Sequence, residues 1–342
     1  MFIILLASGS RGGLLAIVVT SILLIITLHK KIFIHWKSLL VILASMVVIF
    51  MLVDSVFEGR VTARIKHGVK AMFSASTHPL QDIRVDGSKI KIYANNQVIG
   101  VTILDGEIMF LDSEDKQLEI LMNEDIVTFK DDNYKKYVFE ILIVDGRPVL
   151  KLRNFSLRFL VEREGFKFIN EKGRAVKMKE IESWGFEEKE RWGSSRGYIW
   201  SRTIPMITKN WLIGYGPDTF SIHFPQHDFL GKIRAFGTIG MIVDKPHNMY
   251  LQTAVNSGLI ALIAKLAIFA IYLWASGKLF IKCKCESFYE IAGVGIFLGV
   301  FAYLVSGLFN DSVVSVAPVF WVLLGTGIAI NKQISQRSAT EN

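Results

Sequence analysis

Long apolar runs alternate with polar segments along the chain, and the lengths of these runs predict membrane helices. Five runs come close to the ~20 residues that a helix needs to cross a bilayer: 12–28, 38–57, 258–276, 288–308 and 313–330. A polar region, roughly residues 58–246, separates the second run from the third and holds most of the acidic residues. The pattern predicts an α-helical integral membrane bundle of about five full spans with one large water-exposed insertion.

The first seven residues are apolar, but they are long enough for only about a third of a bilayer crossing. They contain no charged segment and no small-residue cleavage site, so a signal peptide is not expected. We interpret them as the end of a partial N-terminal membrane helix whose earlier part is absent. On this interpretation the chain is a truncated fragment without its upstream helices, or the second half of a split protein.

The insertion begins, after a linker at 58–82, with a segment that has the pattern of strands. Turn dipeptides separate its short apolar runs: Asp86-Gly87, Asn95-Asn96, Asp105-Gly106 and Asp145-Gly146. Asp-Gly between apolar runs predicts a hairpin, because glycine adopts the positive φ that a tight turn requires. We therefore expect a small antiparallel β domain at 83–182. It contains no catalytic constellation, which favours a spacer or a module that binds a glycan or a partner.

The remaining segments are an external loop at 183–257, three membrane helices at 258–330 and a tail at 331–342. Lysine or arginine occurs in the short loops 29–37 and 277–287 and in the tail, whereas 309–312 contains neither. Since these residues are enriched on the cytoplasmic side, the insertion is expected to lie on the outer face of the membrane. One basic residue departs from this pattern, because Arg11 lies on the outer side.

Composition agrees with a membrane protein, since 51% of the 342 residues are hydrophobic and the mean hydropathy is +0.39. Both cysteines, Cys283 and Cys285, lie in a predicted cytoplasmic loop, where we expect reduced thiols without a chemical role. An external domain without cysteine favours a bacterial surface over a secretory lumen.

Cationic and titratable residues gather between 191 and 258. Residues 196–211 predict an amphipathic helix with one apolar stripe, formed by Trp200, Ile204, Ile207 and Trp211. Arg202 and Lys209 project from the opposite side, which suits a helix in the membrane interface with its cations free to meet phosphate. The alternative is a solvated helix packed on the β domain. Pro205 is expected to kink or interrupt the helix.

His247 is placed just before the membrane helix at 258–276, on its outer lip. Histidine is the side chain that accepts a proton near neutral pH, although a structural histidine at a helix entry is the alternative. Arg11 has an alternative role too, as a headgroup anchor for its helix. Asn310 and Asp311, at an outer helix end, are expected only to cap it.

Two other features have both a functional and a structural interpretation. His223 and His227, with Asp228 or His247, have the residue types of a zinc site, but their placement on a helix or strand is not established and we predict no metal. Lys265 lies inside a predicted span, where charge is costly, and is expected to snorkel or to face a wet interior.

Four segments, taken in order, resemble the O-antigen ligase and polymerase family. Ser-Gly-Ser-Arg-Gly-Gly at 8–13 resembles its Ser-Arg-Gly signature, and 196–200, 211–220 and 247–259 resemble parts of its large external loop. The resemblance covers about residues 1–56 and 190–330. The chain departs from the family in two ways. Its β segment is not part of the family's common core, and it lacks the several further helices that normally precede the Ser-Arg-Gly motif.

The resemblance implies a membrane glycan transferase that moves a glycan from a polyprenyl-diphosphate carrier to a hydroxyl of a glycan, lipid or protein acceptor. It implies His247 as general base, oriented by Asn248, and Arg11 as the diphosphate-binding residue, aided by Arg196 or Arg202. Further candidates for substrate binding are Lys209 and Lys245. The turn at 214–217 is expected to shape the loop.

No cofactor and no nucleic acid is expected, whereas membrane lipids and other polysaccharide assembly proteins are expected partners. The location implied is the bacterial cytoplasmic membrane, crossed several times. Two alternatives stay open. One is a transporter or flippase for the same lipid carrier, with Lys265 as its intramembrane polar residue. The other is an inactive, truncated membrane anchor that presents the β domain.

Overall fold

The computed structural model describes residues 3, 6, 10–34, 36–63, 65–66, 78–163, 165–281, 283 and 285–340, with side chains except at 11, 29–34, 38–39 and 338–340. The chain forms two compact units. Unit 1 consists of Met1–Ser74, Met206–Ile222 and Lys245–Asn342, and unit 2 consists of Ala75–Pro205 and His223–Asp244. Apart from residues 3 and 6, the predicted partial helix at 1–7 lies outside the described residues.

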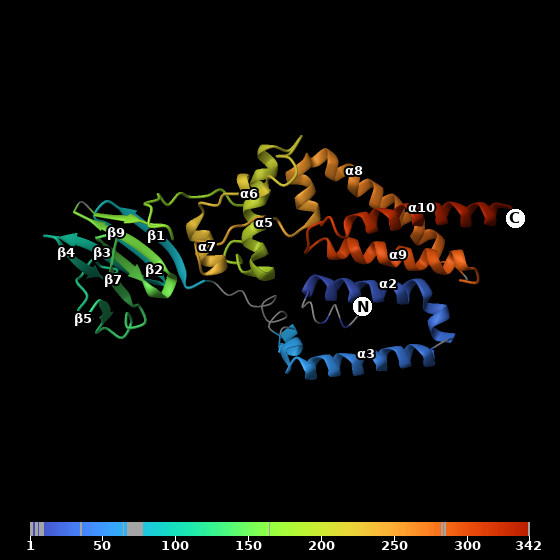
Figure 1. The fold of residues 1–342 in the computed structure, drawn as a ribbon, viewed down its shortest axis with the longest axis horizontal. Coiled ribbons are helices and arrows are strands. Elements are labelled where there is room, and N and C mark those ends of the chain that lie inside the picture. The colour runs from blue at the N-terminus through green and yellow to red at the C-terminus, as the bar shows by residue number, and fades with distance from the viewer. Residues whose placement is uncertain are drawn as a thin grey trace. The chain divides into compact units, whose positions relative to one another are not determined.

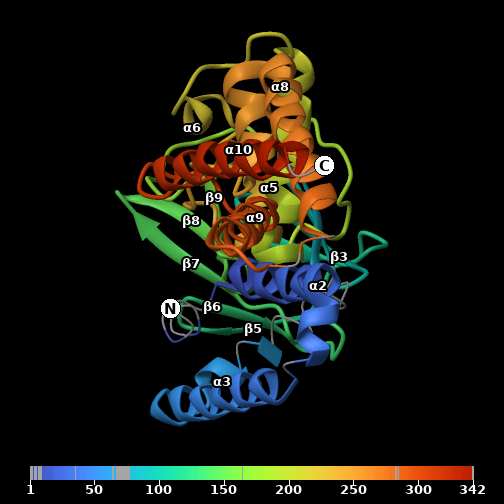
Figure 2. The ribbon, with the colours of Figure 1, turned by 90° about the vertical axis from the view of Figure 1, so that its right-hand side faces the viewer.

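Unit 1 is helical, and each of the five predicted apolar runs lies wholly or mostly in a helix. These helices are α2 (Arg11–Ile34), α3 (Trp36–Val56), α8 (Met249–Phe280), α9 (Phe288–Ser306) and α10 (Ala317–Thr340). Helix α9 packs against α2 and α10 (Figures 1 and 2). Helices α8 and α9 are long and apolar enough to cross a membrane, and shorter apolar stretches occupy Gly12–Leu28 and Leu40–Val56.

Three helices of unit 1 extend beyond the predicted apolar runs. The loop expected at 29–37 is largely helical, because α2 continues to Ile34 after a non-helical residue at Leu28 and α3 begins at Trp36. The tail is also helical, since α10 extends to Thr340. Helix α8 begins at Met249 rather than near 258. Hydropathy marks only the apolar part of a helix, whereas the backbone hydrogen bonds continue through its polar ends.

Unit 2 contains two antiparallel sheets, with strand orders β1-β2-β3-β4 and β10-β9-β8-β7-β6-β5 (Figure 1). The strands are β1 (Leu80–Asp86), β2 (Lys89–Ala94), β3 (Gln97–Leu104), β4 (Glu107–Leu111), β5 (Ile120–Asn123), β6 (Ile126–Phe129), β7 (Phe139–Val144), β8 (Arg147–Leu152), β9 (Leu157–Glu162) and β10 (Gly165–Phe168). Both sheets contribute to one apolar core. The antiparallel strands predicted from the turn dipeptides are thus confirmed.

The sequence pattern explains the hairpins directly. In β2 the side chains of Ile90 and Ile92 are fully buried, while Lys89 and Lys91 face Asp115. The turns at Asn95-Asn96, Asp105-Gly106 and Asp145-Gly146 have positive φ at both residues, as tight hairpins require.

Helix α7 (Phe229–Phe236) belongs to the same unit and packs on the same core. Ile233 is 1% exposed within that core, and the rings of Phe168 and Phe229 lie 5.6 Å apart. The Thr238 hydroxyl donates to Glu171 at 3.0 Å. The strands and residues 223–244, which the sequence assigns to separate segments, therefore fold together.

Candidate functional site

The first turn of α8 carries the histidine that the sequence singles out. Asn248 is the N-cap of the helix, and its Oδ1 accepts hydrogen bonds from the backbone N–H groups of Tyr250 and Leu251, each at 2.9 Å. Its Nδ2 donates to the carbonyl of Leu308 at 2.9 Å. Capping of this kind satisfies N–H groups that have no partner within the helix. Asn248 therefore fixes the helix start rather than orienting the imidazole of His247.

The group that contacts His247 is Asp311. Nδ1 of His247 lies 2.9 Å from Oδ2 of Asp311, whose side chain is 6% exposed, whereas the histidine side chain is 43% exposed. A carboxylate oxygen only accepts, so Nδ1 carries the hydrogen and Nε2 is left to accept a proton. Asp311 was expected only to cap a helix. This pair could not be predicted from local sequence patterns, because 64 residues separate its members.

Backbone and side-chain hydrogen bonds hold this pair in a fixed frame. Met249 N–H donates to the carbonyl of Gly307 at 2.8 Å, and the Tyr250 hydroxyl donates to the carbonyl of Leu304 at 2.8 Å. Ser312 N–H donates to Oε1 of Gln252 at 3.0 Å. These bonds tie the beginning of α8 to the end of α9 and to the segment that carries Asp311.

His247 also has an unusual backbone conformation, with φ of +50°. A left-handed φ at a residue other than glycine costs roughly 1–3 kcal/mol, and such residues cluster at functional sites. In this conformation the residue directly before the N-cap places its imidazole against Asp311.

The beginning of α2 reaches the same segment. A Cβ atom on Gly12 would lie 2.9 Å from Nδ2 of Asn310 and 3.1 Å from Cβ of Phe309, so glycine allows a close approach here and a larger residue would require these side chains to shift. Ser10 caps the helix by accepting the Gly13 N–H at 3.1 Å. Arg11 is the first residue of α2, and its backbone thus lies next to this contact. Its side chain lies outside the described part of the structure, as do Ser8 and Gly9.

The buried side of Asp311 carries an unused acceptor. Within the described residues, Oδ1 of Asp311 is buried and has no hydrogen-bond partner. A buried carboxylate oxygen without a donor is unfavourable. The site therefore combines a histidine with a free ring nitrogen and a carboxylate with a free oxygen.

The helix that carries Arg202 differs from its prediction. Helix α5 (Trp192–Lys209) passes through Pro205 without a break, and its only non-helical residues are 193–195. Ser201 and Thr203 are completely buried, and Trp211 lies beyond the helix end and is 54% exposed. The predicted apolar stripe with a solvated polar face is thus wrong, because neighbouring segments cover this helix on more than one side.

Arg202 is not a free interfacial cation. Its Nε donates to Oδ2 of Asp228 at 2.9 Å, and the two side chains are only 10% and 7% exposed. The guanidinium also lies over the Tyr198 ring, 4.8 Å from its centroid. Desolvation raises the pKa of the Tyr198 hydroxyl well above its usual range. This cluster stabilises unit 2.

The other predicted binding residues are divided between the units. Arg196 belongs to unit 2, and its Nη1 donates to the carbonyl of Gly193 at 2.6 Å. Lys209, in the last turn of α5, and the half-buried Lys245 belong to unit 1, as His247 does. Unit 1 therefore holds the His247–Asp311 pair, the backbone of Arg11 and two of the predicted cations.

The turn at 214–217 inserts its backbone against α8. Tyr215 N–H donates to the carbonyl of Val255 at 2.7 Å, and Leu259 N–H donates to the carbonyl of Trp211 at 2.7 Å. These bonds satisfy backbone groups at a break in α8, where Gly258 has φ of +82° and ψ of 173°. The expected shaping role of this turn agrees with its contacts.

Metal and thiol chemistry have little support in the described part of the chain. No group of three His, Cys, Asp or Glu side chains suitable for a metal ion occurs there. Cys283 and Cys285 are unbridged, with their sulfur atoms 3.4 Å apart. Burial raises the pKa of the Cys283 thiol to about 12, which keeps this thiol protonated.

A comparison with known families agrees with these motifs. Residues 148–266 match the model of the O-antigen ligase family. The resemblance is thus confirmed for this segment, which contains α5, α7, His247 and the beginning of α8. No curated protein and no solved structure matches the chain significantly.

The O-antigen ligase match differs in extent from the resemblance that the motifs suggested. It begins within β8, so it includes strands that we expected to lie outside the common core. It ends within α8 and covers neither Arg11 nor Asp311. His247 lies inside the match, and its carboxylate partner Asp311 lies outside it.

Proposed function

We propose that this protein transfers a glycan from a polyprenyl-diphosphate carrier to an acceptor hydroxyl at the outer face of the bacterial cytoplasmic membrane, as a surface-polysaccharide ligase or polymerase. The observation that carries the proposal is the 2.9 Å contact between His247 and Asp311 at the start of a membrane-length helix. The O-antigen ligase match, which contains His247, supports the reaction class. The lysine and arginine bias of the short loops supports the outer location.

The pair provides a general base for the acceptor. Nε2 of His247 takes the hydroxyl proton while the hydroxyl oxygen bonds to the anomeric carbon of the donor sugar. The bond between that carbon and the diphosphate oxygen breaks, and the diphosphate leaves with the bonding electrons. The resulting imidazolium is stabilised by the carboxylate of Asp311, which also fixes the tautomer. General base catalysis of this kind typically contributes ~10²–10⁴ in rate.

The leaving diphosphate requires cations at the same outer end of the membrane helices, close to His247. Arg11 is our candidate, because a guanidinium binds phosphate oxygens through two parallel hydrogen bonds and keeps its charge. The contact of Gly12 with Asn310 supports this role, since it brings the beginning of α2 to the segment that carries Asp311. Lys209 and Lys245 are further candidates in the same unit. Since the donor carries its own leaving group, the reaction needs no nucleotide.

Exposed apolar surface supports a lipid environment for unit 1. On α3 the side chains of Val41 and Met51 are 69% and 64% exposed. A water-soluble protein of this size rarely presents such a continuous apolar face. Lipid tails or further helices are the surroundings that this surface fits.

The decisive experiment replaces His247 by alanine in the purified protein, reconstituted in nanodiscs with a fluorescent polyprenyl-diphosphate glycan. Product is separated from donor by gel electrophoresis. We expect transfer to fall by about 10²-fold or more, whereas His227→Ala, a histidine in the same matched segment but in unit 2, retains activity. Unchanged product yield and length in His247→Ala would remove the proposed base.

A lipid-carrier transporter is a second candidate, and one observation favours it. Lys265 lies within α8, and its Nζ donates to the Thr253 hydroxyl at 2.9 Å. Intramembrane cations often mark a substrate path. A transporter would move the labelled carrier across liposomes, lose this activity in Lys265→Met, and show no glycan transfer. An inactive anchor would show neither activity.

A further inference from the structure

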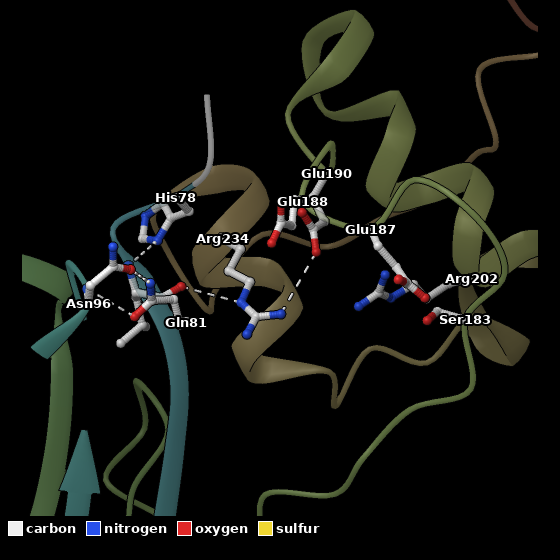
Figure 3. A pocket seen from close by; sticks show the side chains of 10 residues that line it. His78, Gln81, Asn96, Ser183, Glu187, Glu188, Glu190, Arg202 and Arg234 are labelled. Atoms are coloured by element: carbon white, nitrogen blue, oxygen red, sulfur yellow. Dashed lines mark hydrogen bonds and ion pairs between the residues drawn. The ribbon is translucent and has the colours of Figure 1, made fainter. Parts of the chain in front are cut away.

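A polar cavity lies within unit 2, where strand β1, the segment 183–190, α5 and α7 meet (Figure 3). Its volume is about 380 Å³, and nine of its ten lining residues are polar or charged. This volume falls in the range of roughly 300–1,000 Å³ that is typical of small-ligand sites. We call it the Glu190 cavity, after the carboxylate that decides its chemistry.

The Glu190 side chain is largely buried, and among the described residues it forms no hydrogen bond. Its side chain is 10% exposed, and its only ionic contact among the described residues is with Nη1 of Arg234 at 3.8 Å. This distance exceeds that of a hydrogen bond. Figure 3 shows the carboxylate directed into the cavity, beside the Arg234 guanidinium. The Glu190 oxygens can therefore accept hydrogen bonds from a ligand in the cavity.

The guanidinium groups of Arg234 and Arg202 line the cavity, and only some of their nitrogens have hydrogen-bond partners. Arg234 donates through Nε to the carbonyl of Leu80 at 3.3 Å. Arg202 donates through Nε to Asp228 and through Nη1 to the Ser201 hydroxyl, both at 2.9 Å. Within the described chain, Nη2 of each arginine has no partner. The cavity thus presents fixed donors as well as an acceptor.

The carboxylates at the rim add further acceptors. Glu187 and Glu188 are exposed, and no hydrogen bond or ion pair involves their side chains among the described residues. Three carboxylates against two guanidiniums give the lining a formal charge of −1 at neutral pH. This balance disfavours anions, and a single apolar lining residue, Leu80, disfavours apolar ligands.

A ligand that satisfies this lining must donate and accept hydrogen bonds at closely spaced points. A hydroxyl group does both, whereas an ammonium only donates and a phosphate only accepts. A ring with several neighbouring hydroxyls matches this requirement. No metal-binding group occurs in the described chain.

We infer that the Glu190 cavity is a saccharide-binding site that holds a sugar unit of the glycan on which the protein acts. The identity of the ligand as that glycan rests on the proposed function, but sugar binding itself does not. The cavity has walls from β1 and the β2–β3 turn and from the O-antigen ligase match. The strands therefore have a binding role that complements the His247 site.

The test measures binding rather than transfer. The full protein is reconstituted in nanodiscs, because glucoside and maltoside detergents are themselves sugar ligands. Saturation-transfer-difference NMR is recorded with the methyl glycosides of glucose, galactose, N-acetylglucosamine and rhamnose. We expect saturable binding of at least one glycoside to the wild type. Its Kd should rise about tenfold or more in Glu190→Gln, because hydrogen bonds to charged groups are strong.

Two further variants make the result interpretable. Glu187→Gln combined with Glu188→Gln changes only exposed side chains, so the fold is preserved and affinity should still fall. Glu180→Gln, an exposed carboxylate that does not line the cavity, should bind as the wild type does. Absence of saturable binding to the wild type overturns the inference. Wild-type affinity in both Glu190→Gln and the Glu187/Glu188 double variant overturns the inference as well.

Failure of the proposed function is distinguishable from failure of this inference. His247→Ala should bind the glycoside with unchanged affinity, because His247 does not line the Glu190 cavity. A protein that binds glycosides but transfers no glycan contradicts the proposed function alone.

Discussion

Replacing Asp311 by asparagine removes one charge next to the proposed base and leaves the side-chain shape unchanged. Two unit charges about 4 Å apart interact by roughly 4 kcal/mol at an effective dielectric constant near 20. Asp311 is 6% exposed, but His247 is 43% exposed, so solvent screens a substantial part of this energy. We expect ~2–3 kcal/mol of imidazolium stabilisation to be lost. This loss corresponds to about 30- to 150-fold in kcat, at ~1.36 kcal/mol per factor of ten.

The assay is the nanodisc transfer reaction at saturating donor. Asp311→Asn should lower kcat by that factor, while the donor KM changes less than about twofold, since an effect confined to the transition state leaves ground-state binding intact. Asp218→Asn is the matched control, because Asp218 is an exposed carboxylate of the same unit. A kcat for Asp311→Asn within about threefold of wild type, with His247→Ala inactive, would refute the reasoning.

Three predictions concern stability. Gly258→Ala should lower the thermal unfolding temperature by the equivalent of roughly 2 kcal/mol or more, because φ is +82° and a Cβ at this position would lie 2.1 Å from a carbonyl oxygen. Gly277→Ala is the control and should leave the unfolding temperature unchanged, because a Cβ at Gly277 would meet no neighbouring atom within 4 Å. In denaturant unfolding, Arg202→Met should lower the free energy of unfolding by ~3–5 kcal/mol, because Asp228 is left buried and unpaired. Adding Asp228→Asn should recover part of this lost stability. Burial lowers the pKa of Lys232, so the unfolded chain binds more protons and stability rises with pH on approach to the ordinary lysine range. Lys232→Met should reduce the rise of unfolding free energy with pH between pH 7 and 10. An equal pH dependence in the wild type and the variant would show that Lys232 does not cause it.

Regular elements with strong local signals were predictable from the sequence. The apolar runs give α3 and α9 almost to the residue, because a helix in an apolar environment must be apolar along most of its length. The turns at Asn95-Asn96 and Asp105-Gly106 determine where strands end, because few residues adopt two successive positive φ values. These features depend on a residue and its near neighbours.

The pairing of charges was not predictable, because it depends on distant segments. Arg202 has the helical spacing of an interfacial cation, yet its Nε donates a hydrogen bond at 2.9 Å to Asp228, 26 residues further along the chain. Periodicity shows which residues share a face of a helix, but not what covers that face. Asn248 illustrates a second limit. Its proximity to His247 suggested an orienting role, whereas its side chain is used to cap α8.

The position of Asp311 outside the O-antigen ligase match has a consequence for how the site is built. The matched segment contains His247 but not its carboxylate partner, so the proposed base is complete only when 307–312 is held against α8. That attachment consists of hydrogen bonds from Met249, Asn248 and Ser312. Since both sides of each bond lie in unit 1, the base is assembled by the helical unit itself. Strand β1 and the β2–β3 turn, which line the Glu190 cavity, can then serve a separate purpose, which we propose to be binding.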